Sequence, residues 1–307
     1  MLICGGTNCV GPHIIKEFLN DDRYAITILT RGNKRVLYED VYHIKGDVKD
    51  ADAMRNISLH HKHFDVIIDT IAYSAESVIN ILSNIETERY IQISTVGVYE
   101  TTERDVKEND FDPHTYSYRD DSMSVVDSYV NGKRAAEAVA VQKYDIVNPV
   151  IIRPYYVLDS LRPDLEQNVR IWDVVNCIRN NLCFNSKFLR SICCFTDALE
   201  EARMCKVLAD NSYTGAINCC SDGYVTVQEM VEYVEKRMKK EAMYSNEGTV
   251  TNFVVNKKMN TKFYKELMGG DIPILKDWLW KLFDFYIENN DLTFGISWNK
   301  LFSQMYQ

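Results

Sequence analysis

A tyrosine and a lysine four residues apart, Tyr129 and Lys133, have the spacing that most directly suggests chemistry in this chain. Residues four apart share one face of a helix. There the ammonium can stabilise the phenolate, whose unperturbed pKa is about 10, and lower that pKa toward neutrality. Such a phenol can exchange a proton during the interconversion of a carbonyl and an alcohol. The alternative is an ordinary pair on a helix surface; Tyr116 and Tyr118 could replace Tyr129, but neither has a lysine four residues later.

The first eleven residues predict a phosphate-binding turn. The apolar run from Leu2 to Cys4 leads straight into glycines, and apolar residues then recur at helical spacing. This order of strand, glycine-rich turn and helix is typical of dinucleotide folds, in which the backbone approaches a pyrophosphate and the helix N-terminus offers unpaired N–H groups. An ordinary tight turn between strand and helix is the alternative. The turn residues expected to bind the cofactor are Gly5, Thr7, Asn8, Cys9 and Val10.

A basic cluster follows the second expected strand. Arg31 lies 20 residues after Gly11, where dinucleotide folds place an acidic residue for the ribose 2′-hydroxyl. A guanidinium at this position, with Lys34 and Arg35 close by in the sequence, suits a 2′-phosphate instead. The sequence therefore predicts NADP(H) as the preferred cofactor and leaves NAD(H) open.

Together these motifs resemble the short-chain dehydrogenase/reductase superfamily, in its extended and atypical branches, whose members include NAD(P)-dependent nucleotide-sugar epimerases, dehydratases and reductases. The resemblance extends from residue 1 to about residue 235 and includes the motif Gly46-Asp47-Val48 and the pair Arg153-Pro154. In the family, such segments line the adenine and the nicotinamide. The resemblance thus implies further cofactor contacts from Asp47, Val48, Thr70, Ile71, Ala72, Tyr129, Lys133, Pro154 and Tyr155.

The same resemblance implies a catalytic site. The segment 90–99 is similar to the family's fifth strand, which ends in a catalytic Ser or Thr, and the matching residue is Thr95. Thr95 would bond the reacting oxygen, Tyr129 would exchange a proton with it, and Lys133 would stabilise the phenolate and bond the nicotinamide ribose. Val96 stands where dehydratases usually carry an acidic residue. This difference favours a reductase or an epimerase.

Two positions bear on the substrate. Arg190, seven residues before Asp197, has the spacing of an arginine that relatives use on the diphosphate of a sugar nucleotide, although a surface ion pair would explain it as well. Tyr156 is expected to contact substrate, but it stands where relatives often have asparagine, which leaves open a site rebuilt for an unactivated substrate. Asn8 replaces the middle glycine of the turn, as in atypical members. A noncatalytic, nucleotide-sensing protein of the same fold is the alternative function.

Alternating strands and helices predict an α/β fold, a Rossmann-like doubly wound parallel sheet. We expect a dinucleotide-binding domain over 1–160 and a smaller, mainly substrate-binding region over 161–307, with some of its segments returning to the core. A mobile loop over the site is expected at 100–128. The expected strands are 1–4, 25–30, 41–45, 65–70, 89–94, 149–153, 192–195 and 216–219, and later helices are expected at 197–210 and 226–241.

Composition narrows the function classes. A net charge of −9 argues against nonspecific binding of nucleic acid. No apolar run approaches the roughly 18 residues of a membrane span, and the first strand begins at once, so we expect a cytoplasmic protein without a signal peptide. The nine cysteines and six histidines show no zinc spacing, so no metal site is predicted. The apolar run 278–286 favours a core segment or an oligomer contact over a lipid or ligand face, and leaves a homodimer open.

Overall fold

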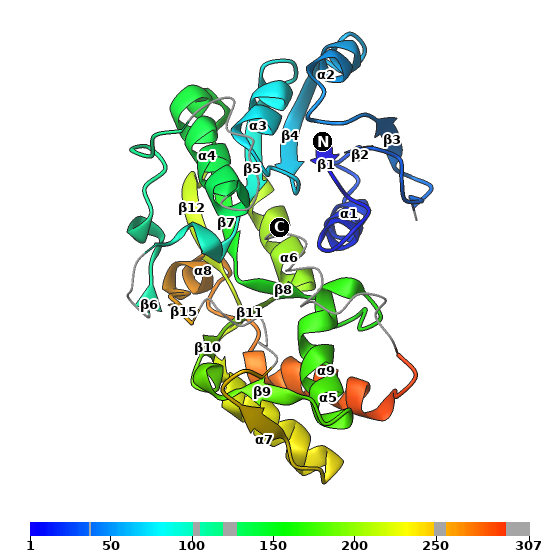
Figure 1. The fold of residues 1–307 in the computed structure, drawn as a ribbon. Helices are drawn as coiled ribbons and strands as arrows, with labels where there is room; N and C mark the ends of the chain where they lie inside the picture. Colours follow the sequence, from blue (N-terminus) through cyan, green and yellow to red (C-terminus); the bar gives the residue numbers. More distant parts are fainter. Residues whose placement is uncertain (37, 101–104, 119–127, 249–255, 293–307) are drawn as a thin grey trace.

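The computed structural model describes residues 1–36, 38–100, 105–118, 128–248 and 256–292. Its centre is a seven-stranded sheet with the order β12-β7-β5-β4-β1-β2-β3 (Figure 1), in which every pair of neighbours is parallel. The predicted Rossmann-like parallel sheet is confirmed. The strands of this sheet are β1 (Leu2–Cys4), β2 (Thr27–Thr30), β3 (Tyr42–Lys45), β4 (His63–Asp69), β5 (Glu86–Ile93), β7 (Val150–Pro154) and β12 (Gly215–Cys219).

Helices cover both faces of the sheet because the strands carry apolar side chains on both sides. On β1, Ile3 packs into one cluster, whereas Leu2 and Cys4 pack into another on the opposite face. The first cluster is covered by α1 (Gly11–Leu19), α6 (Ala198–Ala209) and α8 (Lys262–Leu267). The second is covered by α2 (Ala51–Ser58), α3 (Ala75–Leu82) and α4 (Ser128–Lys143).

The strand order reverses between β1 and β4, the two central strands. In open α/β sheets, ligands bind in the crevice outside the carboxyl ends of the strands at such a reversal. The glycine-rich turn follows β1 and the segment 70–73 follows β4, so both lie at this crevice. The topology therefore places the motifs predicted to bind the cofactor at one edge of the sheet.

The later part of the chain contributes to two regions. β12 and α6 come after residue 160, yet both belong to the first region. β12 is an edge strand of the main sheet, and α6 packs beside α1. The strand expected at 192–195 is split into β10 (Ile192–Cys193), which pairs with β13 (Val225–Thr226), and β11 (Phe195–Asp197), which pairs with β8 (Tyr156–Leu158). The division of the chain at residue 160 remains a prediction.

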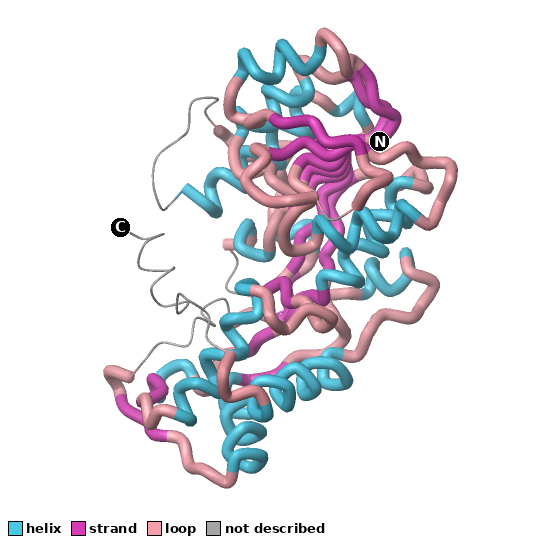
Figure 2. The backbone as a smooth tube through the Cα atoms, turned by 90° about the vertical axis from the view of Figure 1, so that its right-hand side faces the viewer, coloured by secondary structure: helices cyan, strands magenta, loops and turns pink. Residues whose placement is uncertain are grey.

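A second lobe lies beyond the carboxyl edge of the sheet (Figure 2). Its core joins α5 (Val169–Arg179), α7 (Val227–Met238) and α9 (Leu275–Glu288). The apolar run in α9 is part of this core, since Trp278, Leu279 and Phe283 are buried. The remaining short elements are β6 (Asp105–Val106), β9 (Cys183–Asn185), β14 (Met243–Ser245), β15 (Lys258–Met259), and the 3-10 helices η1 (Val96–Val98), η2 (Glu108–Asp110), η3 (Asp145–Val147), η4 (Glu166–Asn168) and η5 (Ser186–Phe188).

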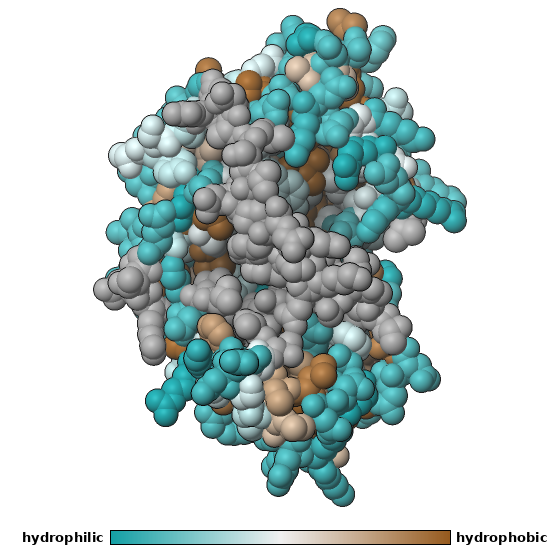
Figure 3. All heavy atoms as spheres, viewed as in Figure 1, coloured by the Kyte–Doolittle hydropathy of each residue, from teal (hydrophilic) through white to brown (hydrophobic). Residues whose placement is uncertain are grey.

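The loop expected at 100–128 is only partly described. Its segments 101–104 and 119–127 lie outside the described residues. Between them, β6 pairs with β15, and η2 follows. On the face shown in Figure 3, the described surface is mainly hydrophilic and its hydrophobic areas are small and separate. None of the described helices is both long and apolar enough to cross a membrane.

Candidate active site

The turn after β1 has the backbone that a dinucleotide requires. Gly5 and Gly6 have φ angles of 102° and 97°, a region that glycine adopts without strain. A Cβ at Gly11 would lie 2.5 Å from the Cα of Gly6, so the start of α1 touches the turn directly. No side chain among the described residues caps α1 at its N-cap, Val10. The free N–H groups of this helix end suit a phosphate, and the predicted cofactor turn therefore fits the group.

The basic cluster after β2 lies beside this turn. The Nζ of Lys34 donates a hydrogen bond to the Oδ1 of Asn8 across 3.1 Å. Arg31 is exposed, and the side chain of Lys45 packs against Gly32. Asn8, the residue that departs from the glycine pattern, thus links the turn to the cluster. Lys34 is a candidate cofactor residue that the sequence analysis quoted but did not assign.

The remaining predicted cofactor residues line the same edge. The hydroxyl of Thr70 donates to the carbonyl oxygen of Cys4 at 2.8 Å, and a Cβ at Gly5 would lie 2.1 Å from this hydroxyl oxygen. This contact joins two segments, which also contain the predicted residues Thr7, Cys9, Ile71 and Ala72. The carbonyl of Val48 accepts a hydrogen bond from the side chain of Asn80. Asp47 turns the backbone by accepting from the N–H of Lys49.

Thr95 and Tyr129 are brought together at the carboxyl end of β5. Thr95 caps η1, where its hydroxyl oxygen accepts from the N–H of Gly97, and this hydroxyl lies near enough to Tyr129 to stabilise the phenolate form. Desolvation raises the pKa of Tyr129, while the Thr95 hydroxyl acts in the opposite direction. The direction differs from the lowered pKa expected from the sequence. Tyr129 is 38% exposed, yet desolvation by the surrounding protein, which the spacing of four residues cannot reveal, is the larger effect.

Lys133 lies one helical turn from Tyr129 and is 2% exposed. Its Nζ donates to the carbonyl oxygen of Ile93 at 2.7 Å and lies 4.4 Å from the centre of the Tyr73 ring. Burial lowers the pKa of Lys133 to about 8, and the carboxylates of Asp69, Glu137 and Glu201 oppose this effect. A partly desolvated ammonium at this place can orient polar groups of a ligand.

Tyr73 connects these side chains and was not predicted as a site residue. Its ring centre lies 6.1 Å from that of Tyr129, and its carbonyl oxygen would be 2.2 Å from a Cβ at Gly132. Gly132 therefore lets α4 pack directly on the segment after β4. The sequence signal was the glycine between Tyr129 and Lys133, which is costly inside a helix unless a close approach requires it.

A buried ion pair fixes α4 to the sheet behind the site. Arg153 on β7 and Glu137 on α4 are both fully buried and 2.7 Å apart. Glu137 also accepts a hydrogen bond from Ser94, the residue before Thr95. Arg153 donates further to the hydroxyl of Tyr99 and to the carbonyl of Glu108. The Arg of the Arg-Pro pair is thus a structural anchor.

The predicted substrate residues differ in burial. Arg190 is exposed, whereas Tyr156 is half-buried. The guanidinium carbon of Arg170 lies 4.0 Å from the centre of the Tyr156 ring, and its charge also acts on Tyr129. Arg170 therefore lies near Tyr156 and Tyr129, a position that the sequence did not predict. Pro154 and Tyr155 are buried, and the Tyr155 hydroxyl donates to the carbonyl of Lys257 at 2.9 Å.

Glu201, at the start of α6, is a further residue that the sequence analysis missed. Its side chain is completely buried, and within the described part of the chain neither carboxylate oxygen has a hydrogen-bond partner. Its charge acts on Cys9 of the glycine turn and on Tyr129. Desolvation raises the pKa of Glu201 to about 8, and Lys133 opposes this rise. No motif in the sequence marked this carboxyl.

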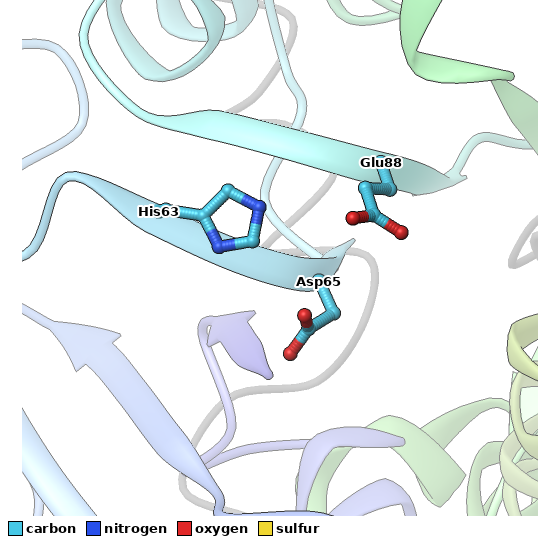
Figure 4. Close-up of side chains that lie close together, drawn as sticks. All are labelled: His63, Asp65 and Glu88. Carbon is cyan, nitrogen blue, oxygen red and sulfur yellow. The ribbon is translucent and has the colours of Figure 1, made fainter.

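The opposite edge of the sheet holds a cavity of about 670 Å³, lined by residues that include Met1, Arg23 and Arg89. Asp65 on β4 and Glu88 on β5 also line this cavity, and His63 on β4 lies close to both (Figure 4). All three side chains are exposed, and exposed carboxylates of this kind are common without a metal ion. Since the predicted site residues lie at the carboxyl ends of the strands, neither feature belongs to the site.

Comparison with known protein families shows the family of this chain. The model of the NAD dependent epimerase/dehydratase family matches residues 1–157. The chain belongs to this family of enzymes, of the extended short-chain dehydrogenase/reductase type, and the resemblance seen in the sequence is confirmed. A search of curated protein sequences gave no match.

Solved structures are similar along nearly the whole chain. A putative epimerase from Burkholderia cenocepacia J2315 has a TM-score of 0.69 at 17% identity, covering 94% of this chain and 98% of the other. The UDP-glucose 4-epimerase of Thermotoga maritima, solved with UDP-glucose, has a TM-score of 0.68 at 15% identity with the same coverage. The UDP-glucuronic acid 4-epimerase of Bacillus cereus, solved with NAD, has a TM-score of 0.66 at 15% identity and again covers 94% and 98%. At these identities the likeness shows the shared fold.

Proposed function

We propose that this chain is an NADP(H)-dependent oxidoreductase that acts on a nucleotide-activated sugar as a reductase or an epimerase. The observation that carries the proposal is that Thr95 and Tyr129 lie together beside the buried ammonium of Lys133. A hydroxyl, a phenol and an ammonium gathered at the carboxyl edge suit proton exchange with a carbonyl or alcohol oxygen. Membership of the NAD dependent epimerase/dehydratase family supports the same chemistry.

Each side chain has a distinct task in this mechanism. A bound nicotinamide cofactor supplies or accepts the hydride. Tyr129 donates a proton to the substrate oxygen when an alcohol forms and removes it in reverse. Thr95 holds that oxygen next to the phenol, and the charge of Lys133 stabilises the phenolate as the proton leaves. For the phenol to act near neutrality, its pKa has to fall from the raised value that it has in this structure.

The phosphorylated cofactor is proposed from the basic cluster after β2. Arg31 stands at the position for the ribose 2′-substituent, and Lys34 already bonds the glycine turn. Cationic side chains bind phosphate by charge-assisted hydrogen bonds. The alternative cofactor is NAD(H), which appears in the description of the family. A titration with NADPH and NADH distinguishes the two.

The nucleotide-sugar substrate is proposed from two arginines and from relatives. Arg170 lies beside Tyr156 and acts on Tyr129, so it can place an anionic group near the reacting oxygen. Arg190 is more exposed and would act farther out, on the diphosphate. UDP-glucose is present in the structure of the Thermotoga maritima relative.

A noncatalytic nucleotide sensor is the competing function. The raised pKa of Tyr129 favours it, because a neutral phenol is a poor base. The first experiment is a calorimetric titration with NADPH and NADH, followed by nucleoside diphosphates in the presence of the bound cofactor and by a screen of keto-sugar nucleotides for turnover. Tight cofactor binding without turnover of any substrate would support the sensor; absence of dinucleotide binding at millimolar concentration would overturn both functions.

A further inference from the structure

The buried carboxyl of Glu201 has no task in the mechanism above. A carboxyl group in an apolar environment is costly unless a partner satisfies it. Both its oxygens are buried and lack a hydrogen-bond partner among the described residues. Orphaned buried polar groups are uncommon in folded proteins, so this one requires an explanation. A ligand is one explanation, provided that the carboxyl faces a ligand site.

Several groups at the cofactor crevice interact electrostatically with Glu201. Its charge acts on Cys9, in the turn that fits a pyrophosphate, and on Tyr129 and Lys133 of α4. α6 packs beside α1, whose N-terminus ends the same turn. The carboxyl therefore lies near groups that surround a dinucleotide in the proposed function. Its helix, α6, covers the face of the sheet opposite to α4.

We propose that Glu201 is a cofactor-binding residue which, as a neutral carboxylic acid, donates a hydrogen bond to a phosphate or ribose oxygen of the bound dinucleotide. This inference rests on the dinucleotide binding of the proposed function. A carboxylate would repel the pyrophosphate, whereas the acid form has an O–H donor that a phosphate or hydroxyl oxygen can accept. Binding of the cofactor is then coupled to protonation of Glu201.

Other titratable groups face Glu201 and must be separated from it. They are Cys9 from the turn, Tyr129 and Lys133 from α4, Cys205 from α6, Cys219 from β12 and Tyr264 from α8. On α1, His13 pairs with Asp159 at 2.7 Å. Lys133 titrates in the same range, because its pKa is about 8. Tyr264 also has a buried hydroxyl without a partner among the described residues. A contact between Glu201 and Tyr264 is the structural alternative.

The test compares dinucleotide dissociation constants at pH 7, 8 and 9 for the wild type, Glu201→Gln, Glu201→Ala and Tyr264→Phe. The amide keeps a donor but does not titrate. If only the protonated form binds and its pKa is about 8, the ratio of the wild-type constant to the Glu201→Gln constant rises about tenfold from pH 7 to pH 9. Lys133 is present in both proteins, so its contribution cancels in this ratio.

At pH 7 we further expect Glu201→Ala to weaken dinucleotide binding about tenfold, because only this variant loses the hydrogen-bond donor. The dissociation constant of Glu201→Gln should stay within about threefold of the wild-type value. Tyr264→Phe should leave binding unchanged. Calorimetry in two buffers of different ionisation enthalpy gives the number of protons taken up, which we expect to be about half a proton lower in Glu201→Gln at pH 8. A constant ratio across pH, or an alanine variant that binds like the wild type, would overturn this inference. Failure of the wild type to bind any dinucleotide would instead overturn the proposed function.

Discussion

The ammonium of Lys133 donates a hydrogen bond to the carbonyl oxygen of Ile93 across 2.7 Å, and this bond joins α4 to the end of β5. Thr95 follows Ile93 by two residues, and Tyr129 precedes Lys133 by one helical turn. The bond therefore holds the helix that carries the phenol against the strand that leads to the threonine. The candidate catalytic residues are held by one strand end and one helix.

Replacement of Tyr129 by phenylalanine is expected to lower turnover by about 10²- to 10⁴-fold, the range typical of a lost acid–base group. Cofactor affinity should stay close to normal, because the phenol acts on substrate. Tyr73→Phe serves as the control, since that ring also lies near Lys133 but has no assigned proton transfer. If Tyr129→Phe retains more than about a tenth of the rate, another residue is the acid.

Replacement of Arg31 by aspartate should shift cofactor preference from NADPH toward NADH. Loss of charge-assisted contacts to a 2′-phosphate costs on the order of 2–4 kcal/mol, measured as the change in the ratio of the two dissociation constants. Arg55→Asp makes the same change of charge on α2, where Arg55 pairs with Asp52, and should leave the ratio unaltered. Tighter binding of NADH than of NADPH by the wild type would contradict the preference itself.

Arg170 and Arg190 are expected to bind the substrate's anionic group. Arg190→Ala should raise the Michaelis constant for a sugar nucleotide about tenfold or more, equivalent to about 1.4 kcal/mol, with little change in cofactor binding. Arg170→Met should raise it at least as much, because that guanidinium is desolvated. Arg162→Ala, on an exposed pair with Asp164, is the matched control. If the Michaelis constant is unchanged in both Arg170→Met and Arg190→Ala, the nucleotide-sugar substrate is contradicted and only the oxidoreductase proposal remains.

The stability of the cofactor-free protein should fall with rising pH because of Glu201. The pKa of this carboxyl is about 8 in the folded state and 4.5 in its ordinary environment. Between these values the folded protein keeps a proton that the unfolded chain has released, so the free energy of unfolding decreases as pH rises from 4.5 to 8. Glutamine does not titrate, so Glu201→Gln should remove this pH dependence. The free energy of unfolding of the variant minus that of the wild type should be about 1–3 kcal/mol larger at pH 8 than at pH 5. Thermal unfolding of both proteins at pH 5 and pH 8 measures this change. An equal stability difference between variant and wild type at the two pH values would contradict the prediction.

The pair Arg153–Glu137 should be costly to break and cheap to replace. Arg153→Met alone leaves a buried carboxylate without its partner, which typically costs about 3–5 kcal/mol. The double variant Arg153→Met, Glu137→Leu should recover part of this loss, because apolar pairs can substitute for buried ion pairs. Denaturant titrations of the single and double variants form the test. Equal losses in both would show that other contacts of Arg153, such as the one to Tyr99, dominate.

The sequence by itself determined the sheet and the identity of several site motifs. The apolar runs and the glycine-rich turn are local signals, since strand periodicity and positive φ angles depend on a few neighbouring residues. For this reason the predicted strands agree closely with those observed, and the family assignment is confirmed. Spacing and resemblance alone predict Tyr129, Lys133 and Thr95 as site residues.

Only the tertiary structure decided the electrostatics and the neighbours of these residues. Desolvation raises the pKa of Tyr129, and this desolvation depends on the packing of segments distant in sequence. Glu201, Arg170 and Tyr73 come from α6, α5 and the end of β4, and nothing local to their sequences indicates that the strand order brings them to one edge. Long-range packing, which a short spacing cannot encode, determines which side chains meet in the crevice.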